Sequence, residues 1–167
     1  MTLTLTTLEA LWFLPLVLPI CVWVALSDLR QMRIPNKAVL ALTAVFLVTG
    51  LFALPMEAYL WRLAALGVVL LAGFIITSLG LVGAGDAKFA AAMAPFIAPG
   101  DYLFFLAMFS LVLIGSWVTH RSAGRVPAVR RVTAHWASWE QGKLFPMGVA
   151  LAGALVIYLA MGFITGI

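Results

Sequence analysis

Long uncharged stretches alternate with short polar segments along the whole chain. Six runs without a charged residue cover 10–27, 38–56, 63–85, 89–100, 102–119 and 144–167. A helix needs about 20 predominantly apolar residues to cross the hydrocarbon core of a bilayer. Five runs approach or exceed this length, and the run at 89–100, which contains Pro95, is shorter. The pattern predicts an all-α polytopic membrane protein with about six transmembrane helices, near residues 10–27, 38–56, 63–82, 86–99, 102–119 and 144–165.

Composition supports this class. The chain has 167 residues, of which 65% are hydrophobic and 10% are charged, and soluble domains carry about 25% charged residues. The N-terminal stretch lacks the basic region of a cleaved signal peptide, so we retain the first run as a span. The predicted spans leave no room for a separate soluble domain, and we expect one membrane-embedded domain over residues 1–167.

The basic residues predict an orientation in the membrane. Nine of the ten lysines and arginines follow the first, third and fifth runs: Arg30, Arg33, Lys37, Lys88, Arg121, Arg125, Arg130, Arg131 and Lys143. The positive-inside rule places such loops in the cytoplasm, so both termini are expected outside, on the periplasmic face. This basic balance indicates orientation and gives no reason to expect nucleic-acid binding.

Two aspartates stand out against this background. Asp28 closes the first run, and Asp86 follows 23 uncharged residues that end with the glycines Gly83 and Gly85. An ionisable group at membrane depth costs about 2.5–3.5 kcal/mol even on lenient insertion scales, so its presence calls for an explanation. On the predicted topology only these two acidic residues combine the cytoplasmic side with an apolar helix end. We therefore treat them as a pair.

A pair of carboxylates can perform acid–base chemistry. Two such groups a few ångströms apart cannot both ionise readily, so they share one proton. The ionised member can then deprotonate water while the protonated member donates to a peptide carbonyl, without a metal or a covalent nucleophile. Gly83 and Gly85 would let an extended substrate approach closely. The alternatives are that Asp86 is the N-cap of a helix beginning at Ala87 and that Asp28 is an ordinary boundary residue.

Three motifs, in order along the chain, resemble one protein family. They are "SDLRQMRIPN" with Asp28, "GAGDAK" with Asp86, and "FPMG" at residues 145–148. Together they resemble the type IV prepilin peptidases, which are intramembrane aspartic proteases with a G-x-G-D motif. The resemblance runs from about residue 20 to the C-terminus.

The resemblance implies a function and a set of site residues. It implies cleavage of the basic leader of a prepilin at the cytoplasmic face of the bacterial inner membrane, with Asp28 and Asp86 catalytic. It also implies substrate contacts at Asn36, Pro146 and Gly148. The chain is similar to the short members associated with tight-adherence (Flp-type, Tad) pili. Because it lacks the paired CxxC motifs of the long members, no S-adenosylmethionine-dependent N-methylation and no cofactor are expected.

Other polar residues have simpler interpretations. Arg30 and Lys88 could support the ionised carboxylate electrostatically, but both can equally anchor helix ends at the membrane surface. Asn36, which follows Pro35, is also a suitable helix cap. Two separated histidines and a single cysteine predict no metal site.

The polar segment 120–143 is expected to lie on the membrane surface. Val129, Val132, Trp136 and Trp139 would fall on one stripe of a helix, which predicts an interfacial amphipathic helix. Its basic residues would contact anionic lipids. Substrate docking is the alternative, although a basic leader would be repelled by these arginines.

Two other functions are compatible with the paired carboxylates. A small ion- or proton-coupled transport protein could use them as a relay, although relay groups should lie nearer the middle of the bilayer. A non-enzymatic subunit of a pilus or secretion assembly could pair them with basic residues.

Overall fold

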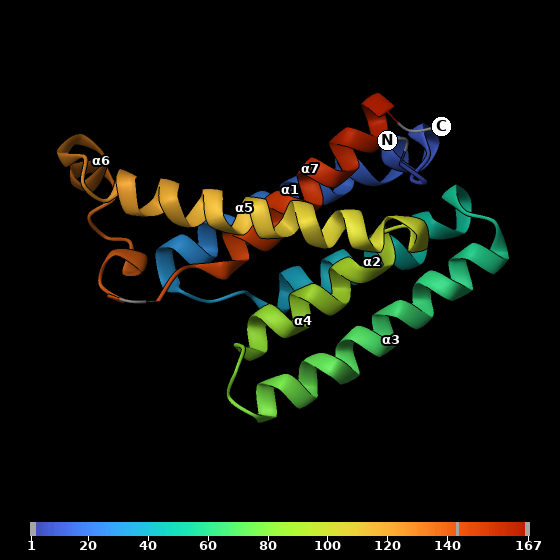
Figure 1. Cartoon of the computed structure of the whole chain (residues 1–167), viewed down its shortest axis with the longest axis horizontal. Coiled ribbons are helices and arrows are strands. Elements are labelled where there is room, and N and C mark those ends of the chain that lie inside the picture. The colour runs from blue at the N-terminus through green and yellow to red at the C-terminus, as the bar shows by residue number, and fades with distance from the viewer. Residues whose placement is uncertain (1–2, 143, 166–167) are drawn as a thin grey trace.

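The chain folds into a bundle of helices (Figure 1). The computed structural model describes residues 3–142 and 144–165. In order, the elements are α1 (Thr7–Gln31), α2 (Asn36–Ala53), α3 (Met56–Ser78), α4 (Ala84–Met93), the 3₁₀ turns η1 (Ala94–Phe96) and η2 (Pro99–Asp101), α5 (Tyr102–Ala123), α6 (Pro127–Val132), η3 (Ala137–Trp139) and α7 (Met147–Thr165).

The all-helical class and a multi-pass membrane protein are confirmed. Five helices in the described residues are long and apolar enough to cross a membrane: α1, α2, α3, α5 together with η2, and α7. Several of these helices are longer than the uncharged runs from which they were predicted. Helix α3 begins at Met56, directly after Pro55, so it contains the charged residues Glu57 and Arg62. Helix α1 continues to Gln31, so Asp28 belongs to its last turn.

The predicted span at 86–99 differs from the other five. Helix α4 has only 10 residues, and the chain continues through η1, an extended pair at Ile97 and Ala98, and η2. Pro95 lacks an N–H and cannot continue an α-helix. Residues 91–98 are all buried, which is the condition under which irregular backbone is tolerated at membrane depth. The segment still connects opposite ends of the bundle, because Asp86 lies near Asp28 and Asp101 contacts Leu5.

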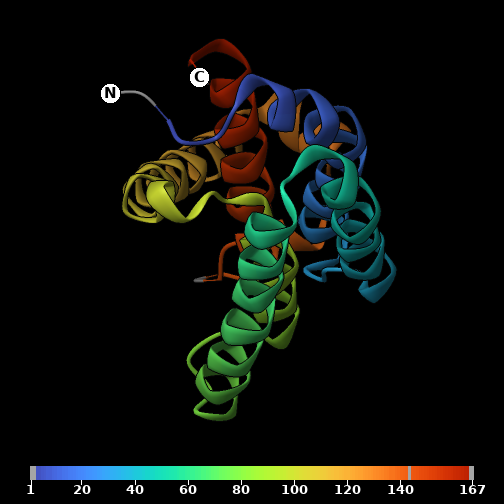
Figure 2. The same ribbon diagram turned by 90° about the vertical axis from the view of Figure 1, so that its right-hand side faces the viewer.

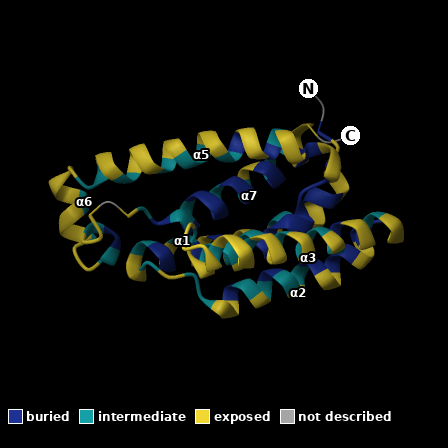
Figure 3. Ribbon diagram, turned by 60° about the horizontal axis from the view of Figure 1, so that its bottom comes forward, coloured by how far each residue is buried: buried dark blue, intermediate teal, exposed yellow. Residues whose placement is uncertain are grey.

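Helices α1 and α7 form the centre of the bundle. They run antiparallel, since Leu5 just before α1 packs against Gly162 whereas Asp28 contacts Gly148. Figure 3 shows much of α7 buried, whereas α3 and α5 are largely exposed. The exposed side chains of α3 and α5 are mainly apolar, as expected for surfaces that face lipid. Helix α4 packs beside α3 (Figure 2).

Buried polar contacts hold the end of the bundle remote from Asp28. Asp101 accepts hydrogen bonds from the backbone N–H groups of Thr4 (2.9 Å) and Leu5 (3.0 Å) and from the Tyr158 hydroxyl (2.7 Å). The same hydroxyl accepts a hydrogen bond from the Ala98 N–H (3.0 Å). The irregular backbone between η1 and η2 therefore has a protein partner where lipid could offer none.

A buried ion pair lies at this same end. Arg62 of α3 and Glu9 of α1 meet at 2.7 Å, and both side chains are less than 10% exposed. Arg62 is the one basic residue that falls outside the three predicted cytoplasmic loops. Its pairing with Glu9 explains how a cation is accommodated there without a solvent-exposed loop.

The expected amphipathic helix in the segment 120–143 is wrong. Helix α5 continues to Ala123, α6 has only six residues, and a turn separates it from η3. The Trp139 indole N–H donates to the Thr133 carbonyl (3.0 Å), which folds the chain back instead of extending a helix. Trp139 consequently stacks on His120 and does not share a lipid-facing stripe with Val129.

Two glycines of α7 test the packing of the core. In Gly162→Ala the new Cβ would overlap the Leu5 side chain, whereas in Gly153→Ala the nearest atom is Val112 Cγ1 at 3.7 Å. We expect Gly162→Ala to lower the free energy of unfolding by about 1–3 kcal/mol, as overpacked cores do. Thermal unfolding in detergent measures the effect, with Gly153→Ala as the control that should melt like the wild type. Equal melting temperatures for the two variants would contradict the packing described here.

Candidate active site

Asp28 lies where the last turn of α1 bends into the connection to α2. Met32 ends the helix in a left-handed conformation (φ 52°), and its N–H donates to the Asp28 carbonyl (2.8 Å). The Ser27 hydroxyl donates to the Arg33 carbonyl (2.9 Å), which holds the connection against α1. The Asp28 side chain is buried, with 5% of the residue exposed.

A backbone amide of α7 binds the Asp28 carboxylate. The Gly148 N–H donates to Asp28 Oδ2 at 2.7 Å, across 120 residues of sequence. Gly148 is the second residue of α7, and the first N–H groups of a helix have no partner within that helix. Such groups, with the positive end of the helix dipole, favour a bound carboxylate. The motif "FPMG" thus contributes a direct contact to Asp28.

Asp86 lies in the first turn of α4. The turn before this helix uses Gly80 in a left-handed conformation (φ 72°), and Gly83 is the N-cap. Asp86 is the third residue of the helix, so the alternative that it is the N-cap is wrong. A Cβ at Gly83 would lie 2.7 Å from Asp86 Oδ2. A glycine at 83 therefore makes room for the carboxylate itself.

Both carboxylates open into one pocket, which we call the aspartate pocket. Its volume is about 620 Å³. It contains three of the other predicted site residues, Gly83, Gly85 and Asn36, and also Lys88. Its remaining lining residues are Ser27, Gln31, Met32, Arg33, Ile34, Pro35, Ala84, Phe145 and Met147. The motifs of Asp28 and Asp86, which are 58 positions apart in the sequence, and a third motif near the C-terminus thus meet in one site.

Only some of the residues predicted to support the two aspartates line the aspartate pocket. Arg30 is exposed and does not line the pocket, whereas Arg33 and Lys88 do. Pro146 is buried directly before α7 and is not a lining residue. Asn36 is the first residue of α2 with Pro35 as the N-cap, so its predicted capping role is wrong. Sequence reasoning missed Phe145 and Met147 as lining residues, although both flank the proline of "FPMG".

The described residues contain no group of three His, Cys, Asp or Glu side chains that could hold a metal ion. The aspartate pocket itself is lined by two carboxylates, by Lys88 and Arg33, and by the polar side chains of Ser27, Gln31 and Asn36.

A second hollow, which we call the apolar groove, lies between α3, α4 and α5. It has a volume of about 590 Å³. Its lining comes from α3 (Trp61, Ala64, Ala65, Val68, Val69), from α4 to Ile97 (Ala90, Met93, Ala94, Ile97), from α5 (Tyr102, Phe105, Leu106, Phe109) and from Leu151. Asp86, Ala90 and Met93 follow the i, i+4, i+7 spacing of one helix face. The groove therefore continues along the face of α4 that carries Asp86.

Comparison with known proteins identifies the family. The model of the type IV leader peptidase family matches residues 15–118, which is more than half of the chain. The protein belongs to the type IV leader peptidase family. Curated proteins gave no match, and neither did solved structures.

Membership of this family makes the protein a membrane peptidase of the prepilin leader peptidase type. The match includes Asp28 and Asp86 and ends before "FPMG". In the structure, Gly148 of that motif nevertheless binds Asp28. The surroundings of Asp28 therefore include residues beyond the matched region, at the start of α7.

Gly148 offers a test of how the carboxylate is held. A Cβ at this position would lie 2.9 Å from Asp28 Oδ2 and 3.2 Å from Asp28 Cβ. We expect Gly148→Ala to displace the carboxylate and to slow prepilin cleavage about 100-fold, because misplacement by about 1 Å has effects of that size. Initial rates with purified enzyme and a prepilin measure this, with Gly153→Ala as the matched control on the same helix. Equal rates for the two variants would show that the contact does not position Asp28.

Proposed function

We propose that this peptidase is an intramembrane aspartyl endopeptidase whose Asp28 and Asp86 remove the leader of a prepilin. The observation that carries the proposal is that both carboxylates, from distant motifs, line one pocket at the same end of the bundle. A transport relay would need a polar route away from this pair, but the neighbouring hollow along α4 is apolar. That hollow favours an apolar substrate segment.

The proposed reaction uses one proton held by the pair. The ionised carboxylate takes a proton from water, whose oxygen bonds to the scissile carbonyl carbon, while the protonated carboxyl donates to the carbonyl oxygen. The C–N bond then breaks as the first carboxyl gives its proton to the leaving nitrogen. The second carboxylate recovers a proton from the tetrahedral intermediate. The products are a carboxylic acid and an amine, and the pair returns to its starting state.

The positions of the basic residues support cleavage at the cytoplasmic face. Arg33 and Lys88 line the aspartate pocket, and Arg121 and Arg125 lie at or just beyond the C-terminal end of α5. The opposite end of the bundle contains the buried Glu9–Arg62 pair and Asp101. By the positive-inside rule the pocket faces the cytoplasm of the bacterial inner membrane, and both termini lie outside. A Flp-type (Tad) prepilin is the proposed substrate on the motif resemblance alone.

The apolar groove is proposed to hold the hydrophobic helix of the prepilin. It begins along the α4 face that carries Asp86, so a helix lying there would bring the adjoining peptide bond to the aspartate pocket. Ala64, Ala65, Ala90 and Ala94 line it, and such small residues let helices approach closely within a membrane.

Replacing either aspartate tests the dyad. Asp28→Asn and Asp86→Asn keep the side-chain shape but remove the ionisation that the reaction needs. We expect each variant to lose at least about 100-fold in cleavage rate, the scale of general acid–base catalysis. Co-expression with a prepilin and a mobility assay for the shortened product measure the loss. The matched control is Glu140→Gln, which removes an exposed carboxylate outside the pocket. If either aspartate variant cleaves the prepilin at the control rate, the proposed catalytic role of the Asp28/Asp86 pair is wrong.

A bulky side chain in the apolar groove tests where the substrate helix lies. Ala64 lines the groove, whereas Leu70 of the same helix is exposed elsewhere on the surface. Ala64→Trp should slow prepilin cleavage by about tenfold, the cost of roughly 1.4 kcal/mol in lost helix contact. Leu70→Trp adds the same aromatic ring outside the groove and should leave the rate unchanged. If both variants cleave normally, the prepilin helix lies elsewhere.

A further inference from the structure

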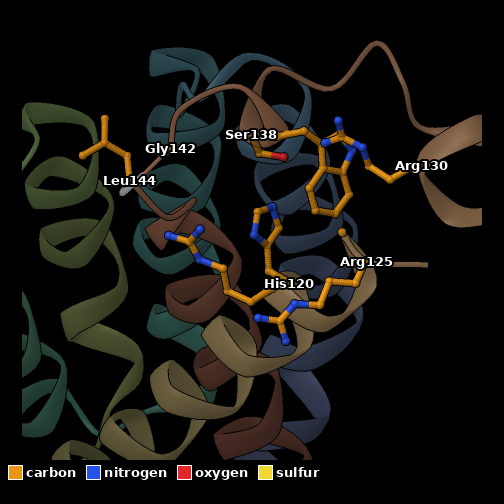
Figure 4. A pocket seen from close by; sticks show the side chains of 9 residues that line it. His120, Arg125, Arg130, Ser138, Gly142 and Leu144 are labelled. Carbon is orange, nitrogen blue, oxygen red and sulfur yellow. The ribbon is translucent and has the colours of Figure 1, made fainter. Parts of the chain in front are cut away.

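A pocket rich in arginine lies at the C-terminal end of α5, apart from the aspartate pocket. We call it the arginine pocket. Its volume is about 240 Å³. Its lining includes His120, Arg121, Arg125, Arg130, Ser138 and Trp139, and Figure 4 shows the side chains around it.

The pocket gathers positive charge and unused polar atoms. Arg121, Arg125 and Arg130 all line it, and among the described residues none of the three forms a salt bridge. The Ser138 hydroxyl and His120 Nε2 are buried and have no hydrogen-bond partner in the described part of the chain. Ser138 is only 3% exposed. A buried hydroxyl without a partner is costly, so these atoms favour a polar ligand in the pocket.

The walls of the pocket are held in place by aromatic contacts. Trp139 stacks on the His120 ring at 4.4 Å, and its indole N–H is fixed by Thr133. The Arg130 guanidinium lies 5.6 Å from the Trp139 ring centre, a cation–π distance. A Cβ at Gly124 would lie 3.0 Å from Trp139, so α5 and the tryptophan are closely packed.

Three guanidinium groups beside a hydroxyl suit a tetrahedral oxyanion. Guanidinium groups bind phosphate through charge-assisted and often bidentate hydrogen bonds. We propose that the arginine pocket binds the phosphate of an anionic phospholipid headgroup. This proposal does not depend on the peptidase chemistry.

The surroundings favour a lipid over free phosphate. A second hollow of about 320 Å³ shares Arg121 and Arg125 with the arginine pocket and is otherwise lined by Trp117, Val118 and Ser122. Trp117 and Val118 are exposed and belong to the apolar part of α5. A phosphate site beside an apolar surface matches an amphiphile, and tryptophan with arginine at a helix end is typical of the headgroup level.

The arginine pocket is also connected to the aspartate pocket. Phe145 meets the His120 ring edge-on at 5.8 Å and also lines the aspartate pocket. Three residues later, Gly148 binds Asp28. A lipid that orders His120 and Trp139 would therefore support the segment that positions a catalytic residue.

Native mass spectrometry of the purified protein in detergent tests the proposal with three probes: dioleoylphosphatidylglycerol, dioleoylphosphatidylcholine and inorganic phosphate. We expect saturable binding of one phosphatidylglycerol, about tenfold tighter than phosphatidylcholine, whose choline group the arginines repel. Arg125→Gln and Arg130→Gln should each weaken this binding about tenfold, because each removes a charge-assisted hydrogen bond, and Ser138→Ala about threefold. Inorganic phosphate at millimolar concentration should compete weakly.

The matched control is Arg131→Gln, which removes an exposed charge from α6, the short helix that also carries Arg130, at a position that does not line the pocket. It should bind phosphatidylglycerol like the wild type. Equal weakening by Arg125→Gln and Arg131→Gln would indicate diffuse surface charge and overturn the site. Equal binding of both lipids, or binding of inorganic phosphate in preference to lipid, would overturn the assignment to an anionic headgroup. These binding measurements do not depend on prepilin cleavage. The lipid proposal and the proposed peptidase mechanism can therefore be contradicted independently of each other.

Discussion

The hydrogen bond from the Gly148 N–H to Asp28 Oδ2 joins the end of α1 to the start of α7, and the rest of the site is arranged around it. It requires the two central helices to run antiparallel with a fixed register. An unpaired carboxylate would be costly at this depth, and an unpaired helix amide would be costly as well. The Gly148 N–H supplies the donor that the Asp28 carboxylate needs, and the carboxylate supplies the acceptor that the N–H needs. The contact therefore stabilises the bundle and orients the Asp28 carboxylate in the aspartate pocket.

The opposite end of the bundle is held by a separate set of polar contacts. Asp101 receives three hydrogen bonds, and Arg62 pairs with Glu9. Within a bilayer, apolar surface alone gives little net attraction between helices, because lipid is as apolar as the side chains it would leave. Polar contacts at both ends, with the packed rings of Phe13, Phe46 and Phe96 between them, therefore determine how the helices align. The register of α7 against α1 that serves Asp28 is thus also maintained from the far end.

Helix α4 shows how a short element can serve a site at membrane depth. Its first turn carries Asp86, where the helix dipole favours a negative charge, and its continuation is irregular from Pro95 onward. Residues 91–98 are buried against other helices, and the Ala98 N–H donates to the Tyr158 hydroxyl. The irregular backbone of this segment is therefore shielded from lipid. Helix α4 and its continuation to Ile97 form one wall of the apolar groove, between α3 and α5.

The sequence by itself determined the helical membrane class, five of the apolar helices and the family, and it indicated that Asp28 and Asp86 lie at the same end of the bundle. These follow from the length of apolar runs and from motifs in which a few charged residues interrupt a hydrophobic chain, which are local properties. It did not predict that 86–99 would be a short helix with an irregular continuation, because that depends on partners at Tyr158 and Asp101. Nor did it predict the folding back of residues 127–139. The apolar spacing of residues 129–139 predicted a helix, but it took no account of tertiary contacts. The hydrogen bond from Trp139 to Thr133 and the stacking of Trp139 on His120 stabilise the folded-back segment instead. Only the tertiary structure brought Gly148 to Asp28 and the three arginines around Ser138, because these contacts join residues separated along the chain by distances that no local pattern encodes.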